Sequence, residues 1–122
     1  MVFAKRVFLI AGIYGLIVLL PQYVLLERNG RDFPPPITHQ EYYYGFIGVA
    51  VVWQIVFLVL SKDPVRYRPM MIPAILEKVS FGIPVVALFM LNRVSGAMLG
   101  AAAVDLLLGS LFIVAYLGTP SA

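Results

Sequence analysis

Four long apolar runs constrain this chain more than any other feature. They cover residues 7–26, 42–60, 72–91 and 97–117 and fill most of the 122 positions. A helix that crosses the hydrocarbon layer of a bilayer needs about 20 mostly apolar residues, each rising about 1.5 Å. The sequence therefore predicts four membrane-spanning helices, the first of them kinked near its end by Pro21.

Composition agrees with a membrane protein and excludes several other classes. Hydrophobic residues make up 61% of the chain and charged residues only 12%, whereas soluble domains carry about 25% charged residues. With no cysteine and one histidine, the chain lacks the ligands for a thiolate or multi-histidine metal site and for a haem clamp. It also lacks a basic run typical of nucleic-acid binding. We expect one domain over residues 1–122, without metal, cofactor or nucleic-acid partner.

The connections between the runs are short, which favours antiparallel neighbours. The expected fold class is therefore all-α, an integral membrane four-helix antiparallel bundle. In the first connection, residues 27–41, the proline triplet 34–36 predicts an extended segment. In the second, Asp63 followed by Pro64 predicts an N-cap and first turn, opening a short interfacial helix. Residues 92–96 predict a tight turn.

Positive residues predict the orientation, because cytoplasmic loops carry an excess of Lys and Arg. With the N-terminus inside, one side holds five such residues and the other three. The five are Lys5, Arg6, Lys62, Arg66 and Arg68; the three are Arg28, Arg31 and Arg93. Both termini are predicted on the cytoplasmic side, of the inner membrane if the source is bacterial. The first run exceeds a signal-peptide core of about 7–15 residues, so we expect it to remain as a span.

Ionisable residues inside the apolar runs are the main functional lead. A charged side chain at bilayer depth costs about 2.5–3.5 kcal/mol on insertion scales, so it is a functional-site hypothesis by default. With each helix midpoint at the bilayer centre, five polar residues fall in the cytoplasmic half, roughly 4–7 Å from the centre. They are Tyr14, Gln54, Glu77, Lys78 and Ser110. Asp105 falls roughly 4 Å beyond the centre on the other side, where we expect no basic partner.

Helical spacing predicts which faces turn inward. On the third helix the expected inward stripe is Pro73, Glu77, Ser80, Pro84 and Ala87. On the fourth it is Ala97, Ala101, Asp105 and Gly109, whose small residues let helices approach closely in lipid. Lys78 is about 100° around the helix from Glu77. We therefore expect its ammonium group to reach back to the cytoplasmic interface.

Two interpretations of these polar residues stay open. In the structural one, hydrogen bonds and a Glu77–Lys78 pair fix the register of the helices. In the functional one, Glu77 binds a cation or carries a proton in a polar pocket. Asp105 is either protonated, paired with a neighbouring chain or exposed to a water-filled cavity. Arg66 and Arg68 are candidates for binding anionic lipid headgroups, although positive-inside anchoring explains them equally well.

Two loop sequences carry a resemblance. Residues 34–39 and 63–69, followed by Glu77 and Lys78, resemble a group of small uncharacterised bacterial four-helix membrane proteins that are DoxX-like in size and helix count. The resemblance implies a four-helix membrane fold and no particular activity. The chain is also similar in size to small multidrug-resistance exporters. Those rely on an acidic residue in their first helix, and the first run here has none. Sterol-isomerase-like proteins share only the use of buried acids.

Three functions follow as hypotheses. The small-residue faces and an unpartnered Asp105 favour a non-enzymatic binding or accessory component of a membrane complex or homo-oligomer. The second hypothesis is a small proton-coupled transporter that uses Glu77 and Asp105. The third is a membrane enzyme, or a binder of a lipophilic small molecule, with these acids as proton donors. The sequence contains no hydrolase, phosphate-binding or metalloprotease motif, so it favours a function without catalysis.

Overall fold

The computed structural model describes residues 2–32 and 36–121, and this part of the chain is all-helical. Its elements are α1 (Val2–Leu19), η1 (Leu20–Val24), α2 (Leu26–Asp32), α3 (Gln40–Lys62), η2 (Arg68–Met70), α4 (Met71–Met90) and α5 (Gly96–Gly118), where η denotes a 3-10 helix. Four stretches of 23 residues are long and apolar enough to cross a membrane: Val2–Val24, Gln40–Lys62, Arg68–Met90 and Gly96–Gly118. The prediction of four long apolar helices is confirmed at that level.

The first connection differs from its prediction. The helix α1 ends at Leu19 and the 3-10 helix η1 begins at Leu20, one residue before Pro21, because proline lacks the N–H that an α-helical hydrogen bond requires. The helix α2 then follows, which the sequence analysis did not predict; its first turn is closed by the Asn29 N–H donating to Leu25 O at 2.8 Å. Of the proline triplet, Pro34 and Pro35 lie outside the described residues.

Asp63 shapes the second connection without opening an α-helix. Its Oδ1 accepts the Arg66 N–H at 3.3 Å, and its carbonyl oxygen accepts the Tyr67 N–H at 3.1 Å. These bonds close a turn directly after α3, and the 3-10 helix η2 begins at Arg68. The expected N-cap hydrogen bond is present, but the expected short helix is a turn followed by η2.

The third connection is the predicted tight turn. Asn92 adopts a left-handed conformation with φ of 60°. The Asn92 N–H donates to Phe89 O and the Arg93 N–H donates to Leu88 O, both at 2.9 Å. This pair of bonds is the Schellman arrangement that ends helices. The Ser95 side chain then accepts the Met98 N–H at 3.4 Å and starts α5.

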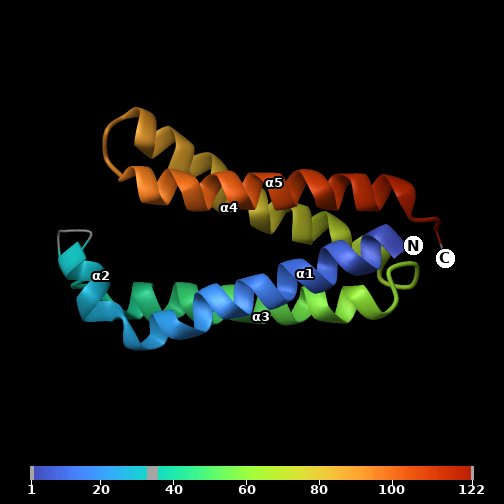
Figure 1. The fold of residues 1–122 in the computed structure, drawn as a ribbon, viewed down its shortest axis with the longest axis horizontal. Helices are drawn as coiled ribbons and strands as arrows, with labels where there is room; N and C mark the ends of the chain where they lie inside the picture. The colour runs from blue at the N-terminus through green and yellow to red at the C-terminus, as the bar shows by residue number, and fades with distance from the viewer. Residues whose placement is uncertain (1, 33–35, 122) are drawn as a thin grey trace.

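The four long helices form two pairs. α1 packs along α3, and α4 packs along α5 (Figure 1). The two pairs touch mainly through α1 and α5, whereas α3 and α4 have little contact. Both termini and the α3–α4 connection lie at one end of the molecule, here called the terminal end (Figure 1). α2 and the α4–α5 turn lie at the opposite end, here called the loop end.

Three aromatic rings join the two pairs. Phe8 of α1, Phe57 of α3 and Phe112 of α5 are each 0% exposed. The ring centroid of Phe112 lies 4.3 Å from that of Phe8 and 5.0 Å from that of Phe57. Small and apolar residues surround them: Ala4, Val7, Ala11, Leu60, Met71, Ala74 and Ala115. Close packing and the geometry of the stacked rings therefore hold the helices together here.

Candidate functional site

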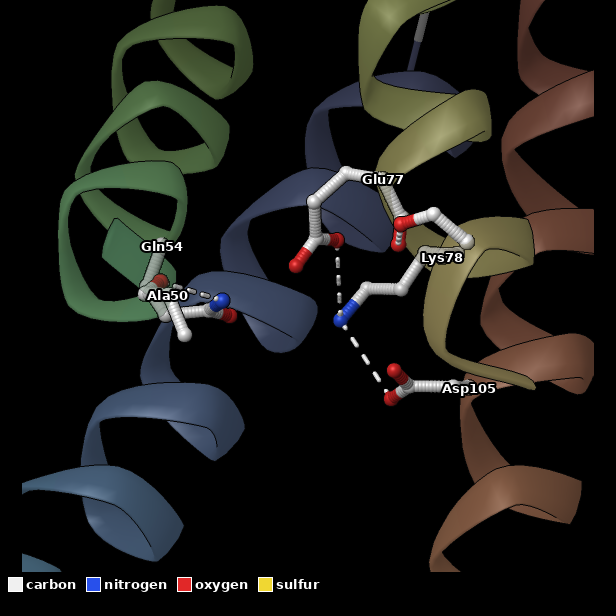
Figure 2. A network of polar contacts seen from close by, with 6 residues as sticks. Ala50, Gln54, Glu77, Lys78 and Asp105 are labelled. Atoms are coloured by element: carbon white, nitrogen blue, oxygen red, sulfur yellow. Dashed lines mark hydrogen bonds and ion pairs between the residues drawn. The ribbon is translucent and has the colours of Figure 1, made fainter. Parts of the chain in front are cut away.

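Lys78 lies between two carboxylates in the middle of the molecule. Its Nζ is 3.5 Å from Asp105 Oδ1, within hydrogen-bond distance, and 3.7 Å from Glu77 Oε2. The whole Lys78 residue is only 4% exposed. Figure 2 shows the ammonium group between Glu77, on its own helix, and Asp105, on α5. We call Glu77, Lys78 and Asp105 the acid–lysine cluster.

The buried face of α4 explains the position of Lys78. That face consists of Met71, Ala74, Lys78, Gly82 and Val85. A Cβ added at Gly109 of α5 would lie 3.2 Å from the Lys78 Cβ, so Gly109 makes room for the base of the lysine side chain. The ammonium nitrogen lies 5.1 Å from the centroid of the Phe57 ring, which is cation–π distance. The methylene groups of Lys78 therefore pack on α5, and its ammonium group lies beside the Phe57 ring.

Two predictions about α4 are wrong. Lys78 does not reach back to the interface, because Asp105 and Glu77 provide its counter-ions inside the protein. The predicted inward stripe was also displaced by one residue. Ser80, Pro84 and Ala87 are exposed, and Glu77 is only half-buried at the edge of the true inward face.

The expectation that Asp105 has no basic partner is also wrong. It was based on comparing the depths of Cα positions, and the lysine side chain is long enough to reach a carboxylate one helical turn away. Lys78 packs over Gly109 and bonds to Asp105, one turn earlier on α5. The cluster thus links α4 to α5 by charge as well as by packing.

Gln54 of α3 brings a further polar group to this region. It is 2% exposed, and its Nε2 donates to Ala50 O of the same helix at 2.9 Å. Its Oε1 is buried and accepts no hydrogen bond, and the same holds for Glu77 Oε2. In Figure 2 the Gln54 amide points from α3 toward the space that the acid–lysine cluster occupies. Gly15 of α1 makes room for this amide, because a Cβ there would overlap it.

The predicted polar layer forms only in part. Gln54, Glu77 and Lys78 come together, whereas Tyr14 is 40% exposed on the outside of α1. Ser110 is also exposed, and its hydroxyl donates to Leu106 O within α5 at 2.9 Å. The position of each residue along its helix therefore predicted its depth. It did not predict the direction of the side chain, which points outward at Tyr14 and Ser110.

The two arginines proposed for lipid headgroups have different surroundings. Arg66 is exposed, with its guanidinium 5.4 Å from the Tyr67 ring centroid. Arg68 is half-buried and stacks at 3.8 Å on the ring of Tyr116. Its Nε also donates to Tyr116 O at 3.1 Å, near the end of α5. The Arg66 side chain is therefore exposed, while Arg68 holds α5 against the α3–α4 connection.

A second feature, which the sequence analysis missed, runs along the outside of α5. Every residue of this face is exposed, and the spacing alternates between four and three: Gly96, Gly100, Ala103, Leu107, Ser110, Val114 and Leu117. A Cβ added at Gly96 or Gly100 would meet no atom of residues 2–32 or 36–121 within 4 Å. We call this face the open stripe. The expected small-residue face of α5 packs only around Asp105 and Gly109, while Ala97 and Ala101 are exposed.

Two cavities of about 300 Å³ each lie away from the acid–lysine cluster. One, toward the loop end, is lined by Tyr23, Val24, Leu26, Glu27, Gln40 and Tyr44. The other is apolar and is lined by Val52, Ile55, Val56, Val59, Leu60, Tyr67 and Met70. The enzyme hypothesis needs a cavity that touches an intramembrane acid. Neither of these two is lined by Glu77 or Asp105.

Comparison of this chain with protein-family models, with curated proteins and with solved structures finds no match in any of the three.

Proposed function

We propose that this chain is an integral membrane protein whose four long helices form an antiparallel bundle with both termini in the cytoplasm. The length and apolar composition of the helices support the spans. The surplus of Lys and Arg toward the terminal end supports the orientation. Large apolar side chains such as Ile10, Ile17 and Val49 are well exposed, as expected for surfaces that face lipid.

The absence of cysteine from the sequence permits a direct test of this topology. We expect Thr38→Cys, at the loop end, to react with a membrane-impermeant maleimide on intact cells. Ser121→Cys, near the C-terminus, should react only after the membrane is permeabilised. The opposite labelling pattern would show that the proposed orientation is inverted. Equal labelling of both positions on intact cells would argue against four spans.

We further propose that the protein is a non-enzymatic binding or accessory component that works as a homo-oligomer. The open stripe is the observation that carries this proposal. Small residues at helical spacing let two helices approach closely in lipid, where van der Waals contact drives association. Within this chain Gly82 and Gly109 allow such a close approach between α4 and α5. Among the residues that the structure describes, Gly96 and Gly100 have no neighbour of this kind.

A second copy of the chain is the partner that best fits the open stripe. The stripe carries no charged residue over its whole length, so an identical surface meets no like-charge repulsion. Its alternating spacing of four and three is the spacing with which two helices interlock side chains. The support once drawn from an unpartnered Asp105 no longer applies, because Lys78 is its partner. The stripe alone now supports self-association.

The test is the oligomeric state of purified protein in mild detergent, measured by native mass spectrometry or sedimentation. We expect the unmodified chain to form an oligomer and Gly100→Leu to shift it toward monomer. Ala101→Leu is the matched control, because Ala101 is also exposed but lies off the stripe. A wild-type monomer at all concentrations would overturn the proposal, and so would a Gly100→Leu variant that associates normally. A stable heterologous partner at the stripe would replace the second copy.

A second candidate function, proton-coupled transport, draws on the acid–lysine cluster. Two carboxylates face one ammonium group at 3.5 and 3.7 Å, so the cluster has one acid more than it needs for charge balance. Both acids retain part of their surface, with Glu77 17% and Asp105 20% exposed at the side chain. In liposomes, an imposed pH gradient should then drive uptake of a lipophilic cationic dye. We expect Glu77→Gln and Asp105→Asn to abolish uptake and Glu27→Gln to leave it unchanged; unchanged uptake in both cluster variants would reject this function.

A further inference from the structure

We propose that the apolar cavity beside α3 binds one acyl chain of an anionic phospholipid, whose headgroup is held by Lys62 and Arg66. This cavity, of about 300 Å³, is here called the acyl groove. The inference rests on the membrane-spanning arrangement proposed above, but not on which end of the molecule is cytoplasmic. It depends neither on self-association nor on transport.

The length and lining of the acyl groove suit a hydrocarbon chain. Five of its seven lining residues lie on one face of α3 between Val52 and Leu60, a length of about 12 Å along the helix. Val52 and Val59 are exposed and Leu60 is buried, so the groove opens outward and its floor rests on the core. Its lining is almost entirely apolar. The groove therefore offers burial to a hydrocarbon chain that runs along α3, as an acyl chain does beside a membrane-spanning helix.

Two basic side chains lie at the terminal end of this groove. Tyr67, which follows α3 in the chain, lines the groove, and the Arg66 guanidinium lies 5.4 Å from the centroid of its ring. Lys62 is the last residue of α3 and lies on the same helix face as Val59, three positions earlier. Both basic side chains are exposed. They therefore lie where the headgroup of a lipid with its acyl chain in the groove would be.

The protein itself does not neutralise these two charges. Among residues 2–32 and 36–121, neither Lys62 nor Arg66 takes part in an ion pair. The nearby Asp63 carboxylate accepts the backbone N–H of Arg66 at 3.3 Å. Arg68 is excluded as a third headgroup contact, because it stacks on Tyr116 and bonds to its carbonyl oxygen. Two cations and one acid thus favour an anionic headgroup over a zwitterionic one, whose own ammonium group they would repel.

The charges at the two ends of the molecule favour the same headgroup. In the part of the chain that the structure describes, the terminal end carries five basic side chains and one acidic one, whereas the loop end carries three of each. The terminal set is Lys5, Arg6, Lys62, Arg66 and Arg68 with Asp63; the loop set is Arg28, Arg31 and Arg93 with Glu27, Asp32 and Glu41. Basic residues at a membrane surface attract anionic lipids, so the groove opens at the end with the greater attraction.

Trp53 makes a direct test possible. It is the single tryptophan of the protein, and it directly follows Val52 on α3, so its fluorescence reports on lipid at the groove. The purified full chain in phosphatidylcholine vesicles is titrated with phosphatidylglycerol or phosphatidylcholine whose acyl chains carry bromine, a quencher of tryptophan fluorescence. We expect the phosphatidylglycerol to reach half-maximal quenching at a mole fraction at least about fivefold lower, the effect of one basic residue near an anionic lipid. Equal quenching by the two lipids would overturn the proposal.

Substitution of the basic residues tests the headgroup contact. Lys62→Gln and Arg66→Gln should each reduce the preference for phosphatidylglycerol by up to about fivefold. Arg93→Gln is the matched control, because it removes an exposed positive charge at the loop end, and it should leave the preference unchanged. A preference that survives in the double variant Lys62→Gln and Arg66→Gln would overturn the assignment of the headgroup.

Val59→Phe tests the groove itself, because the larger side chain fills part of it. We expect weaker quenching by the brominated phosphatidylglycerol. Val49→Phe is the matched control, since Val49 is exposed on the same helix but does not line the groove. Equal quenching in both variants would overturn the assignment of the acyl chain. Absence of a lipid preference, with the expected labelling of Thr38→Cys and Ser121→Cys, rejects this inference alone, whereas equal labelling on intact cells rejects the spans themselves.

Discussion

Lys78 and Asp105 are 27 positions apart in the sequence, yet Lys78 Nζ lies 3.5 Å from Asp105 Oδ1. The ion pair joins α4 to α5 at a point well away from the turn that connects them. Glu77 adds a second carboxylate at 3.7 Å. The energetic consequence is asymmetric, because removing the single base leaves two acids facing each other, whereas removing one acid leaves a balanced pair.

Replacement of the base should therefore be the most damaging single change in the cluster. We expect Lys78→Met, whose unbranched side chain is one atom shorter and uncharged, to lower the free energy of unfolding by about 3–5 kcal/mol, the usual effect of breaking a buried ion pair. Denaturation in mixed micelles measures this. The control is the triple variant Lys78→Met, Glu77→Gln and Asp105→Asn, which has no charge to leave unpaired and should recover most of the loss. Equal stability of Lys78→Met and wild type would contradict the assigned role.

Gly15 should tolerate no side chain, because a Cβ would overlap the amide of Gln54. We expect Gly15→Ala to lower the free energy of unfolding by about 1–3 kcal/mol through overpacking between α1 and α3. In the double variant with Gln54→Ala, part of that loss should return, since the two residues contact each other. Gly45→Ala is the matched control: nothing lies within 4 Å of its added Cβ, and no loss is expected. A purely additive double variant would show that Gln54 is not the obstacle.

Arg68 should matter more than its neighbour Arg66. Arg68→Lys loses the planar group that stacks on Tyr116 at 3.8 Å and the Nε–H that bonds to the Tyr116 carbonyl. We expect a loss of about 1 kcal/mol in unfolding free energy, the typical worth of one such hydrogen bond. Arg66→Lys, at an exposed position, should change it by less than about 0.5 kcal/mol. Equal effects of both substitutions would indicate that charge alone matters here.

The conformation of Asn92 makes a prediction for the turn between α4 and α5. With φ at 60°, a β-branched residue is strained by about 1–2 kcal/mol, while glycine is not. We expect Asn92→Val to lower the thermal unfolding midpoint and Asn92→Gly to leave it unchanged or slightly higher. If both variants unfold at the same temperature, the left-handed turn does not persist in the purified protein.

Much of the candidate site was within reach of the sequence, and the part that was missed has a definite cause. Depth follows from residue number at a fixed rise, so Gln54, Glu77 and Lys78 were correctly placed in one region. The face of a helix that turns inward depends on the neighbouring helix that packs against it. α4 has apolar residues on several faces, so its own sequence does not select one. Gly109 of α5 leaves the space that allows Lys78 to be buried. The open stripe could have been found earlier, because its spacing of four and three is visible in the sequence.

The sequence by itself determined four long apolar helices, the position of the polar groups along them and the turn after α4, because these depend on local composition, on helical rise and on single residues such as Asn92. Only the tertiary structure decided that α1 pairs with α3 and α4 with α5, and that Lys78 turns inward to reach Asp105. These outcomes depend on contacts between residues far apart in the chain. In the bilayer proposed for this chain, apolar side chains gain little free energy from one another, so small differences in steric fit and charge pairing select the partners.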